Sequence, residues 1–217
     1  MEIIELMKER HSVRQYTDKK IEKEKREVLN TLIAKINQKA GLHIQMIYDE
    51  PKCFNSMMAH YGKFDGVNNY IALVGEKSKS DESLGYYGEQ IVLKAQELGL
   101  NTCWVAMTHG KSKAQIDKGE KMVCLISLGY GKTAGAAHKS KRLSEVCNYK
   151  KDMPEWFLSG MEAALLAPTA MNRQKFYFEL LPDNSIKITC GKGLYTKLDL
   201  GIVKYHFEVV SGKVNWK

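Results

Sequence analysis

Two short, almost uninterrupted apolar runs place the strongest constraint on how this chain folds. They are Asn69–Gly75 (NYIALVG) and Met122–Leu128 (MVCLISL), and each is followed by a polar or glycine-containing stretch. Apolar runs of this length between turn signals are typical of buried strands. The chain is therefore expected to contain a sheet with strands that are apolar along their whole length.

Helical patterns surround these two runs. Helices are predicted over residues 2–9, 22–39, 84–99, 111–118, 155–166 and 196–210, and further strands over residues 43–49, 176–181 and 185–190. Val28, Leu32, Ile33 and Ile36 mark the apolar face expected of the second helix. Pro182-Asp183-Asn184 predicts a hairpin turn between the last two strands. Because hairpins interrupt the alternation of helices and strands, the predicted fold class is α+β rather than doubly wound.

Length and composition favour a single domain over residues 1–217. Hydrophobic residues make up 44% of the chain, which supplies a sizeable core. No run reaches the roughly 18 to 20 apolar residues that a membrane span needs. The first ten residues, MEIIELMKER, lack the apolar run of a signal peptide. A cytoplasmic location without a membrane partner is therefore expected.

Cysteine spacing and net charge exclude further classes. The 5 cysteines are an odd number without a CxxC pair, so neither a disulfide framework nor a zinc site is predicted, and no metal is expected. Lysine and arginine (33) exceed aspartate and glutamate (25), and the net charge of +8 allows an anionic partner. No zinc finger, RNP-type aromatic pair or heptad zipper accompanies that charge, so a nucleic-acid partner is not predicted.

Residues 131–153 are the best candidate for a linker, because they combine glycine and alanine with a basic run at 138–142. The halves on either side, 1–145 and 154–217, each place a helix and a strand before a helix bracketed by glycines. Those brackets are Gly88–Gly99 and Gly201–Gly212. An internal duplication is one interpretation, and a coincidence of two glycine pairs is the other.

The first segment that could carry chemistry is Arg10-His11-Ser12-Val13-Arg14. In an extended backbone, side chains alternate between two sides, so Arg10, Ser12 and Arg14 would share one side. Guanidinium groups bind phosphate through two hydrogen bonds at once, and a hydroxyl adds a neutral one. The alternative is an exposed basic loop.

Two further segments offer polar or flat surfaces. In residues 167–174 (APTAMNRQ), the amides of Asn172 and Gln174 could serve a heterocycle, or the segment could simply end a helix. In residues 98–106 (LGLNTCWVA), Trp104 could line a flat pocket, or the segment could be plain core.

Together, these segments resemble the nitroreductase family of FMN-dependent flavoproteins. The family's Arg-x-Ser-x-Arg-x-aromatic segment is matched by residues 10–16, and its Ser/Ala-Pro-Ser/Thr-x-x-Asn-x-Gln segment by residues 167–174. Its Leu-Gly-Leu-x-Thr-Cys-Trp segment is matched by residues 98–104. Gly129-Tyr130 and the basic pair Lys141-Arg142 match as well. The resemblance implies a mainly antiparallel central sheet flanked by helices.

The resemblance also implies a cofactor, substrates and site residues. The implied cofactor is FMN, and the implied substrates are NAD(P)H as reductant and a nitroaromatic or quinone-like compound as acceptor. The implied cofactor-binding residues are Arg10, His11, Ser12, Arg14, Trp104, Val105, Ala106, Arg142, Pro168, Thr169, Ala170, Asn172 and Gln174. Arg10, Ser12 and Arg142 would serve the phosphate, and Arg14 the pyrimidine edge of the flavin.

No catalytic side chain is predicted, because the flavin carries the chemistry. His11, His109 and His138 are expected to be structural or surface histidines rather than proton donors. The alternative function is a flavin-binding protein for storage or redox sensing, without meaningful turnover.

One departure from the family bears on assembly. Most members carry the Pro-Ser-x-x-Asn segment shortly after the arginine segment, but residues 34–42 lack it and the motif stands in the C-terminal half. This placement resembles a divergent branch known from thermophilic and anaerobic bacteria. The simplest interpretation is a monomeric pseudo-dimer, in which the C-terminal half acts as a truncated second subunit. A homodimer is the alternative.

Overall fold

The computed structural model describes residues 2–78, 81–212 and 214–217. The chain forms two compact units. The sheet unit consists of Arg10–Ser80 and Gln90–Ala137, and the hairpin unit of Met1–Glu9, Asp81–Glu89 and His138–Lys217. The boundary at residue 137 falls within the segment predicted to be a linker.

The sheet unit is built on four antiparallel strands in the order β1-β2-β4-β3. Their bounds are β1 Gln45–Ile47, β2 Asn69–Glu76, β3 Asn101–Val105 and β4 Glu120–Gly129. The two apolar runs of the sequence lie in the neighbouring central strands β2 and β4, which pair from Asn69↔Leu128 to Glu76↔Glu120. The predicted antiparallel sheet and the α+β class are confirmed.

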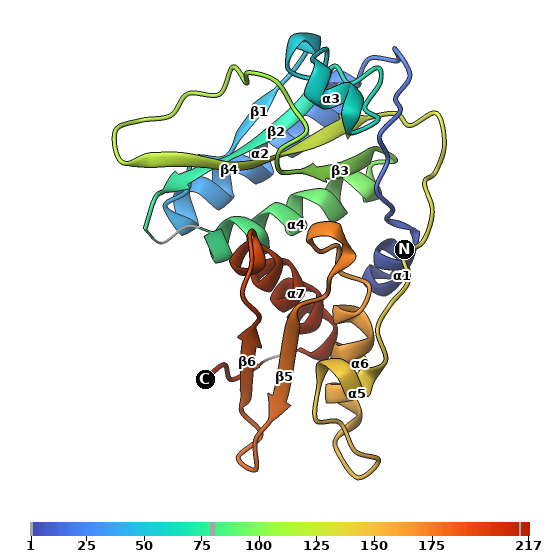
Figure 1. The fold of residues 1–217 in the computed structure, drawn as a ribbon, viewed down its shortest axis with the longest axis vertical. Helices are drawn as coiled ribbons and strands as arrows, with labels where there is room; N and C mark the ends of the chain where they lie inside the picture. The colour runs from blue at the N-terminus through green and yellow to red at the C-terminus, as the bar shows by residue number, and fades with distance from the viewer. Residues whose placement is uncertain (1, 79–80, 213) are drawn as a thin grey trace. The chain divides into compact units, whose positions relative to one another are not determined.

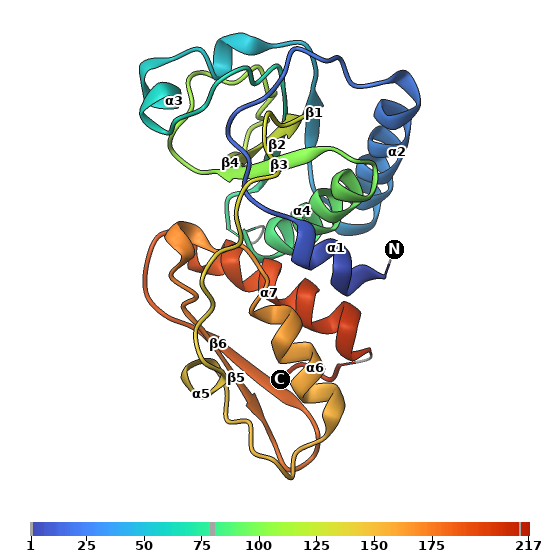
Figure 2. The same cartoon turned by 90° about the vertical axis from the view of Figure 1, so that its right-hand side faces the viewer.

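Helices and loops cover opposite faces of this sheet. Helix α2 (Lys23–Ala40) and the second half of α4 (Asp81–Glu97) lie on one face, and η1 (Pro51–Cys53) and α3 (Met57–Tyr61) lie on the other (Figures 1 and 2). The buried face of α2 consists of Leu29, Ile33 and Ile36. Val28, predicted for that face, is 39% exposed, because the buried stripe begins one residue later at Leu29.

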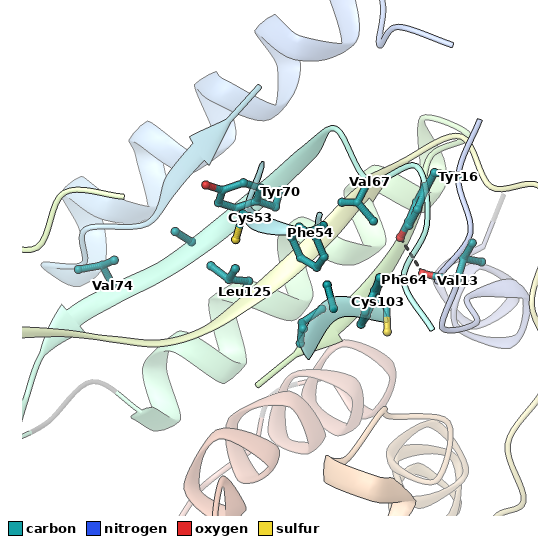
Figure 3. Close-up of a cluster of buried hydrophobic side chains, with 13 residues drawn as sticks. Val13, Tyr16, Cys53, Phe54, Phe64, Val67, Tyr70, Val74, Cys103 and Leu125 are labelled. Carbon is teal, nitrogen blue, oxygen red and sulfur yellow. Dashed lines mark hydrogen bonds between the residues drawn. The ribbon is translucent and has the colours of Figure 1, made fainter. Parts of the chain in front are cut away.

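A cluster of buried side chains fills the face of the sheet that α3 covers (Figure 3). The ring centroids of Phe54 and Phe64 lie 5.2 Å apart, and those of Phe54 and Tyr70 lie 5.7 Å apart. Tyr16 joins the same cluster. Its hydroxyl donates to the carbonyl oxygen of Val13 at 2.7 Å and lies 2.8 Å from Ser127 Oγ in β4. The arginine segment that ends at Tyr16 is thereby fixed to the sheet.

The hairpin unit combines several helices, among them the first half of α4, with a β-hairpin. Its elements are α1 (Ile3–Glu9), α5 (Leu143–Val146), α6 (Glu155–Ala164), η2 (Ala170–Asn172), β5 (Phe176–Leu180), β6 (Ile186–Cys190) and α7 (Thr196–Ser211). Its core is aromatic: Phe178 stacks on Phe207 at 4.9 Å, and Trp216 lies 5.8 Å from Phe207. The predicted hairpin and final helix are confirmed.

Glycines explain how α7 packs on the first half of α4. A Cβ atom on Gly201 would lie 1.9 Å from the carbonyl oxygen of Glu82, and one on Gly85 would lie 2.0 Å from that of Leu198. The two helix backbones therefore touch where they cross. Gly88 and Gly201, taken as the starts of bracketed segments, both lie inside helices. The bracketing that suggested a duplication is therefore wrong, although a duplication itself stays a prediction.

The helix predicted over residues 111–118 is absent, and this stretch is an extended loop. The side chain of Gln45 provides the physical reason. Its Nε2 donates to Gln115 O at 2.7 Å, and its Oε1 accepts from Gln115 N at 2.9 Å. These bonds satisfy backbone groups that a helix would otherwise pair.

Three other boundaries differ from the sequence expectation. Residues 101–105 of the apolar segment after α4 form β3, and the linker candidate contains the short helix α5. Helix α4 begins at Asp81, so the polar loop predicted over residues 77–83 is shorter, and its residues 79–80 lie outside the described part. Among the described residues, no helix is both long and apolar enough to cross a bilayer.

Candidate functional site

The Arg10–Arg14 segment runs beside β3 in the sheet unit. Ser12 forms a parallel bridge with Thr102, and Val13 N donates to Thr102 O at 3.0 Å. Val13 is 2% exposed and belongs to the core. Backbone pairing with β3 and burial of Val13 therefore hold this segment extended, as its predicted alternation requires.

Three predicted side chains influence one buried group, the thiol of Cys103. Burial raises the pKa of this thiol, while the charge of Arg14, a hydrogen bond with Ser12 and the charge of Arg10 lower it by less. The groups of Arg14, Ser12 and Arg10 are therefore near enough to influence the buried thiol, which stays neutral because burial dominates.

The two arginines differ in exposure. Arg10 is 3% exposed, whereas Arg14 is exposed to solvent. The side chain of Arg14 forms no hydrogen bond or ion pair with any other residue that the structure describes. Its guanidinium is therefore available to a ligand without breaking an internal contact.

The start of the linker candidate folds over the same segment. A Cβ atom on Gly135, which has a φ of +78°, would lie 2.8 Å from His11 Cβ and 3.1 Å from Ser12 O. Gly131 N donates to Asn101 Oδ1 at 2.9 Å. His11 Nδ1 is buried and has no hydrogen-bond partner among the described residues. Residues 131–135 are thus a packed cover on the arginine segment rather than a free linker.

The predicted residues at the end of β3 divide between core and surface. Val105 is 2% exposed and its side chain is part of the buried cluster, which favours the core interpretation for that side chain. Trp104 and Ala106 are half-buried. Since Ser12 pairs with Thr102, these residues continue the strand that supports the arginine segment.

The Pro168–Gln174 segment lies in the hairpin unit, after α6. Met171, Asn172 and Gln174 have φ angles of +55°, +53° and +46°, which coil the chain tightly. Ala170 N donates to Asp199 Oδ1 at 2.9 Å, and Gln174 N donates to Thr169 Oγ1 at 3.0 Å. Burial raises the pKa of Asp199 to about 6.

The amides of Asn172 and Gln174 bind the basic run of the linker candidate. Gln174 Nε2 donates to Lys139 O at 2.8 Å and to Asn172 Oδ1 at 2.9 Å, and Gln174 Oε1 accepts from Lys141 N at 2.9 Å. Asn172 Nδ2 also donates to Lys139 O, at 2.8 Å. Both donor hydrogens of Gln174 are used, so this residue mainly positions its neighbours.

These bonds bring two lysines to the loop that sequence reasoning left out of the site. Lys141 Nζ donates to Gln174 O at 3.0 Å, and Lys139 is exposed. Arg142, which was predicted, is 87% exposed along its side chain and pairs with Glu145 through an Nε–Oε2 distance of 3.4 Å. The signal for the lysines was the basic run itself, but nothing in the sequence shows which members the loop holds.

The predicted site residues thus form two clusters. The sheet unit holds one, made of Arg10, His11, Ser12, Arg14, Trp104, Val105 and Ala106. The hairpin unit holds the other, made of Pro168, Thr169, Ala170, Asn172 and Gln174 with Arg142.

A family model described as "Putative TM nitroreductase" matches residues 2–211. The chain belongs to this family. The nitroreductase resemblance drawn from the motifs is therefore confirmed over nearly the whole chain. No curated protein matches this chain.

Solved structures show the same nitroreductase fold. A "putative nitroreductase" from Thermotoga maritima is 24% identical, with a TM-score of 0.73, and the match covers 97% of this chain and 83% of that one. A nitroreductase family protein from Clostridium difficile 630 is 20% identical with a TM-score of 0.53, covering 71% of this chain and 100% of that one. A "putative nitroreductase" from Desulfovibrio desulfuricans, solved in complex with FMN, is 17% identical with a TM-score of 0.53, covering 71% and 99%.

Proposed function

We propose that this protein is an FMN-dependent oxidoreductase that transfers hydride from NAD(P)H to nitroaromatic or quinone-like acceptors. Family membership supports the class of reaction. The observation that carries the cofactor is the pairing of the extended Arg10–Arg14 segment with β3, because alternation along an extended backbone directs Arg10, Ser12 and Arg14 to one side. The fold is shared with a protein solved in complex with FMN.

The arginine segment suits the charges of FMN. FMN has an anionic phosphate, and its ring gains negative charge at the pyrimidine edge when reduced. Arg10 and Ser12 would hold the phosphate through a charge-assisted and a neutral hydrogen bond, and Arg14 would face the pyrimidine edge. His11 Nδ1, buried and without a hydrogen-bond partner among the described residues, adds a polar atom for the ligand.

The protein's own contribution to the reaction is electrostatic. When bound, FMN supplies the ring that accepts and donates hydride. The charge of Arg14 would favour the negative, reduced ring. The Cys103 thiol does not weaken this field, because burial raises its pKa and keeps it neutral. No side-chain acid or base is assigned.

The hairpin unit contributes a second set of proposed FMN contacts. Thr169, Ala170 and Asn172 remain candidates, since Asn172 is exposed and keeps one donor hydrogen and one lone pair. Gln174 is reassigned as a positioning residue for Lys139 and Lys141. The two lysines join Arg142 as proposed phosphate-binding cations.

The first experiment tests the cofactor. The purified protein is expected to be yellow, with flavin absorbance and a released cofactor whose mass is that of FMN. If it is colourless and does not take up added FMN, the proposal is wrong. Release of FAD instead would contradict the cofactor.

The second experiment separates the enzyme from its alternative, a flavin-binding protein without turnover. Oxidation of NADH and of NADPH is followed with a quinone or a nitrofuran as acceptor. Repeated turnover with either reductant supports the oxidoreductase. Stable FMN binding without acceptor-dependent turnover would favour storage or sensing.

Assembly is a separate proposal, carried by the position of the Pro-Thr-x-x-Asn motif in the C-terminal half. A monomeric pseudo-dimer predicts a species near the chain mass of 24.7 kDa that carries one FMN. Light scattering combined with flavin titration measures both quantities. A stable dimer that loses FMN as it dissociates would favour the homodimer instead.

A further inference from the structure

Three side chains with metal-binding atoms meet at one end of the sheet, away from the motifs discussed above. His43 precedes β1, Asp117 lies in the loop before β4, and Glu120 is the first residue of β4. One ligand atom from each lies within 4.8 Å of the others. His43 Nδ1 and Glu120 Oε2 are 2.8 Å apart. These separations are short enough for a single ion to bridge all three groups after small side-chain rotations.

The backbone that carries these groups is already fixed. Glu120 N donates to Asp117 O at 3.0 Å, and Asp117 N donates to Glu120 Oε2 at 2.9 Å, which closes the turn between them. His43 N donates to Val74 O at 3.0 Å. Gln45 holds the incoming loop through its two bonds to Gln115. Outer contacts of this kind orient ligands and raise metal affinity.

The charge of the cluster favours a cation. Glu120 supplies one carboxylate, and its Oε2 accepts from Asp117 N at 2.9 Å. Asp117 supplies a second, exposed carboxylate. His43 supplies a nitrogen donor that a hydrogen bond to Glu120 already points into the cluster.

We propose that His43, Asp117 and Glu120 bind one divalent transition-metal ion, with Zn²⁺ as the best match. One imidazole nitrogen and two carboxylate oxygens suit such an ion, whereas Ca²⁺ needs more oxygen ligands and Mg²⁺ is usually held by carboxylates, phosphates and water. With three protein ligands, water completes the coordination. The ion replaces the hydrogen between His43 Nδ1 and Glu120 Oε2, and that proton leaves to solvent or moves to Nε2.

The role of this ion would be structural. It would join the start of β1 to the loop that connects β3 and β4, and that loop begins at Ala106. The site does not depend on FMN, so it stands or falls separately from the proposed oxidoreductase.

Calorimetric titration of metal-free full-length protein with Zn²⁺ tests the site. One Zn²⁺ is expected to bind per chain, and His43→Ala or Glu120→Gln should weaken binding by about tenfold or more. His60→Ala and Asp152→Asn are the matched controls, because both residues lie outside the cluster. The controls should bind like the unmodified protein.

Thermal unfolding supplies a second readout. Zn²⁺ should raise the Tm of the unmodified protein and of the controls but not of His43→Ala, because only binding to the folded state stabilises it. The Tm of each variant without metal shows whether it folds. If His43→Ala folds and binds Zn²⁺ as tightly as the unmodified protein, the binding is adventitious and the site is wrong. Absence of Zn²⁺ binding to the unmodified protein overturns the proposal as well.

Discussion

His206 Nε2 lies 3.0 Å from Glu89 Oε1, and both side chains are completely buried. The other ring nitrogen, Nδ1, lies 3.0 Å from Ala163 O, which can only accept, so Nδ1 carries a hydrogen. Nε2 and a carboxylate oxygen need a second proton between them. The pair therefore holds that proton in the core of the hairpin unit and links α4, α6 and α7.

Breaking this pair should be costly. Glu89→Ala leaves the buried imidazole without its carboxylate and should lower the free energy of unfolding by roughly 3–5 kcal/mol. Replacing both residues, as Glu89→Leu with His206→Leu, should recover a large part of that loss because no buried polar group is left alone. Urea unfolding of Glu89→Leu, His206→Leu and the double variant measures the coupling between the two side chains. If the losses in free energy of unfolding of the two single variants simply add up in the double variant, the two side chains are not coupled.

Asp199 gives a prediction for pH dependence. Burial raises its pKa from 3.8 to about 6, so the folded state holds its proton more tightly than the unfolded state does. The group therefore favours folding below pH 4 relative to pH 7, and that advantage is lost as the pH rises through about 6. Asp199→Asn keeps an oxygen for Ala170 N and removes the buried charge.

The variant should be more stable than the unmodified protein at pH 8 by roughly 1–3 kcal/mol, since each pKa unit is worth about 1.4 kcal/mol. The difference should vanish at pH 4. Urea unfolding at both pH values checks this. Equal destabilisation at pH 4 and pH 8 would instead mean that the carboxylate is needed for its geometry.

The order of elements could be predicted because local signals agreed with the tertiary structure. The middle residues of strands β2 and β4 are almost all apolar, and these strands form the centre of the sheet. Pro154 precedes α6, and the turn at residues 182–184 joins β5 to β6. The helix predicted over residues 111–118 does not form, because a distant contact outweighs the local signal there. Gln45, which is 70 residues from Gln115 along the chain, accepts the hydrogen bond of the Gln115 backbone N–H.

In the candidate site, too, local patterns could be predicted and contacts between distant residues could not. The alternation of side chains along Arg10–Arg14 could be predicted from the sequence, since β3 holds that segment extended. The role of Gln174 was not, because its partners at Lys139 and Lys141 are set by a coiled loop. The His43–Glu120 contact joins residues 77 positions apart and leaves no local pattern.

The Gln174 network predicts a local rather than a global effect. Gln174→Ala removes the side-chain partner of Lys141 N and one of the two side-chain donors to Lys139 O, and should cost about 1–3 kcal/mol. Hydrogen exchange at the amide of Lys141 should become much faster. The exposed neighbour Arg173 provides the control, and Arg173→Ala should leave that amide protected. Unchanged exchange in Gln174→Ala would show that other contacts hold the basic run.

Arg10 and Arg14 should affect FMN in different ways. Arg10→Ala should weaken FMN binding by roughly 1.5–3 kcal/mol, the range for a hydrogen bond to a charged group. Arg14→Ala should mainly lower the flavin midpoint potential, because it removes a positive charge that favours the reduced ring. A loss of about 1.4 kcal/mol in the stabilisation of the reduced ring corresponds to a shift of roughly 30 mV in the midpoint potential of a two-electron couple.

Lys35→Ala, which removes one exposed charge from α2, is the control for net charge. Full flavin occupancy of Arg10→Ala at micromolar concentration would remove Arg10 from the phosphate. A midpoint potential that moves equally in Arg14→Ala and Lys35→Ala would reduce the role of Arg14 to general charge.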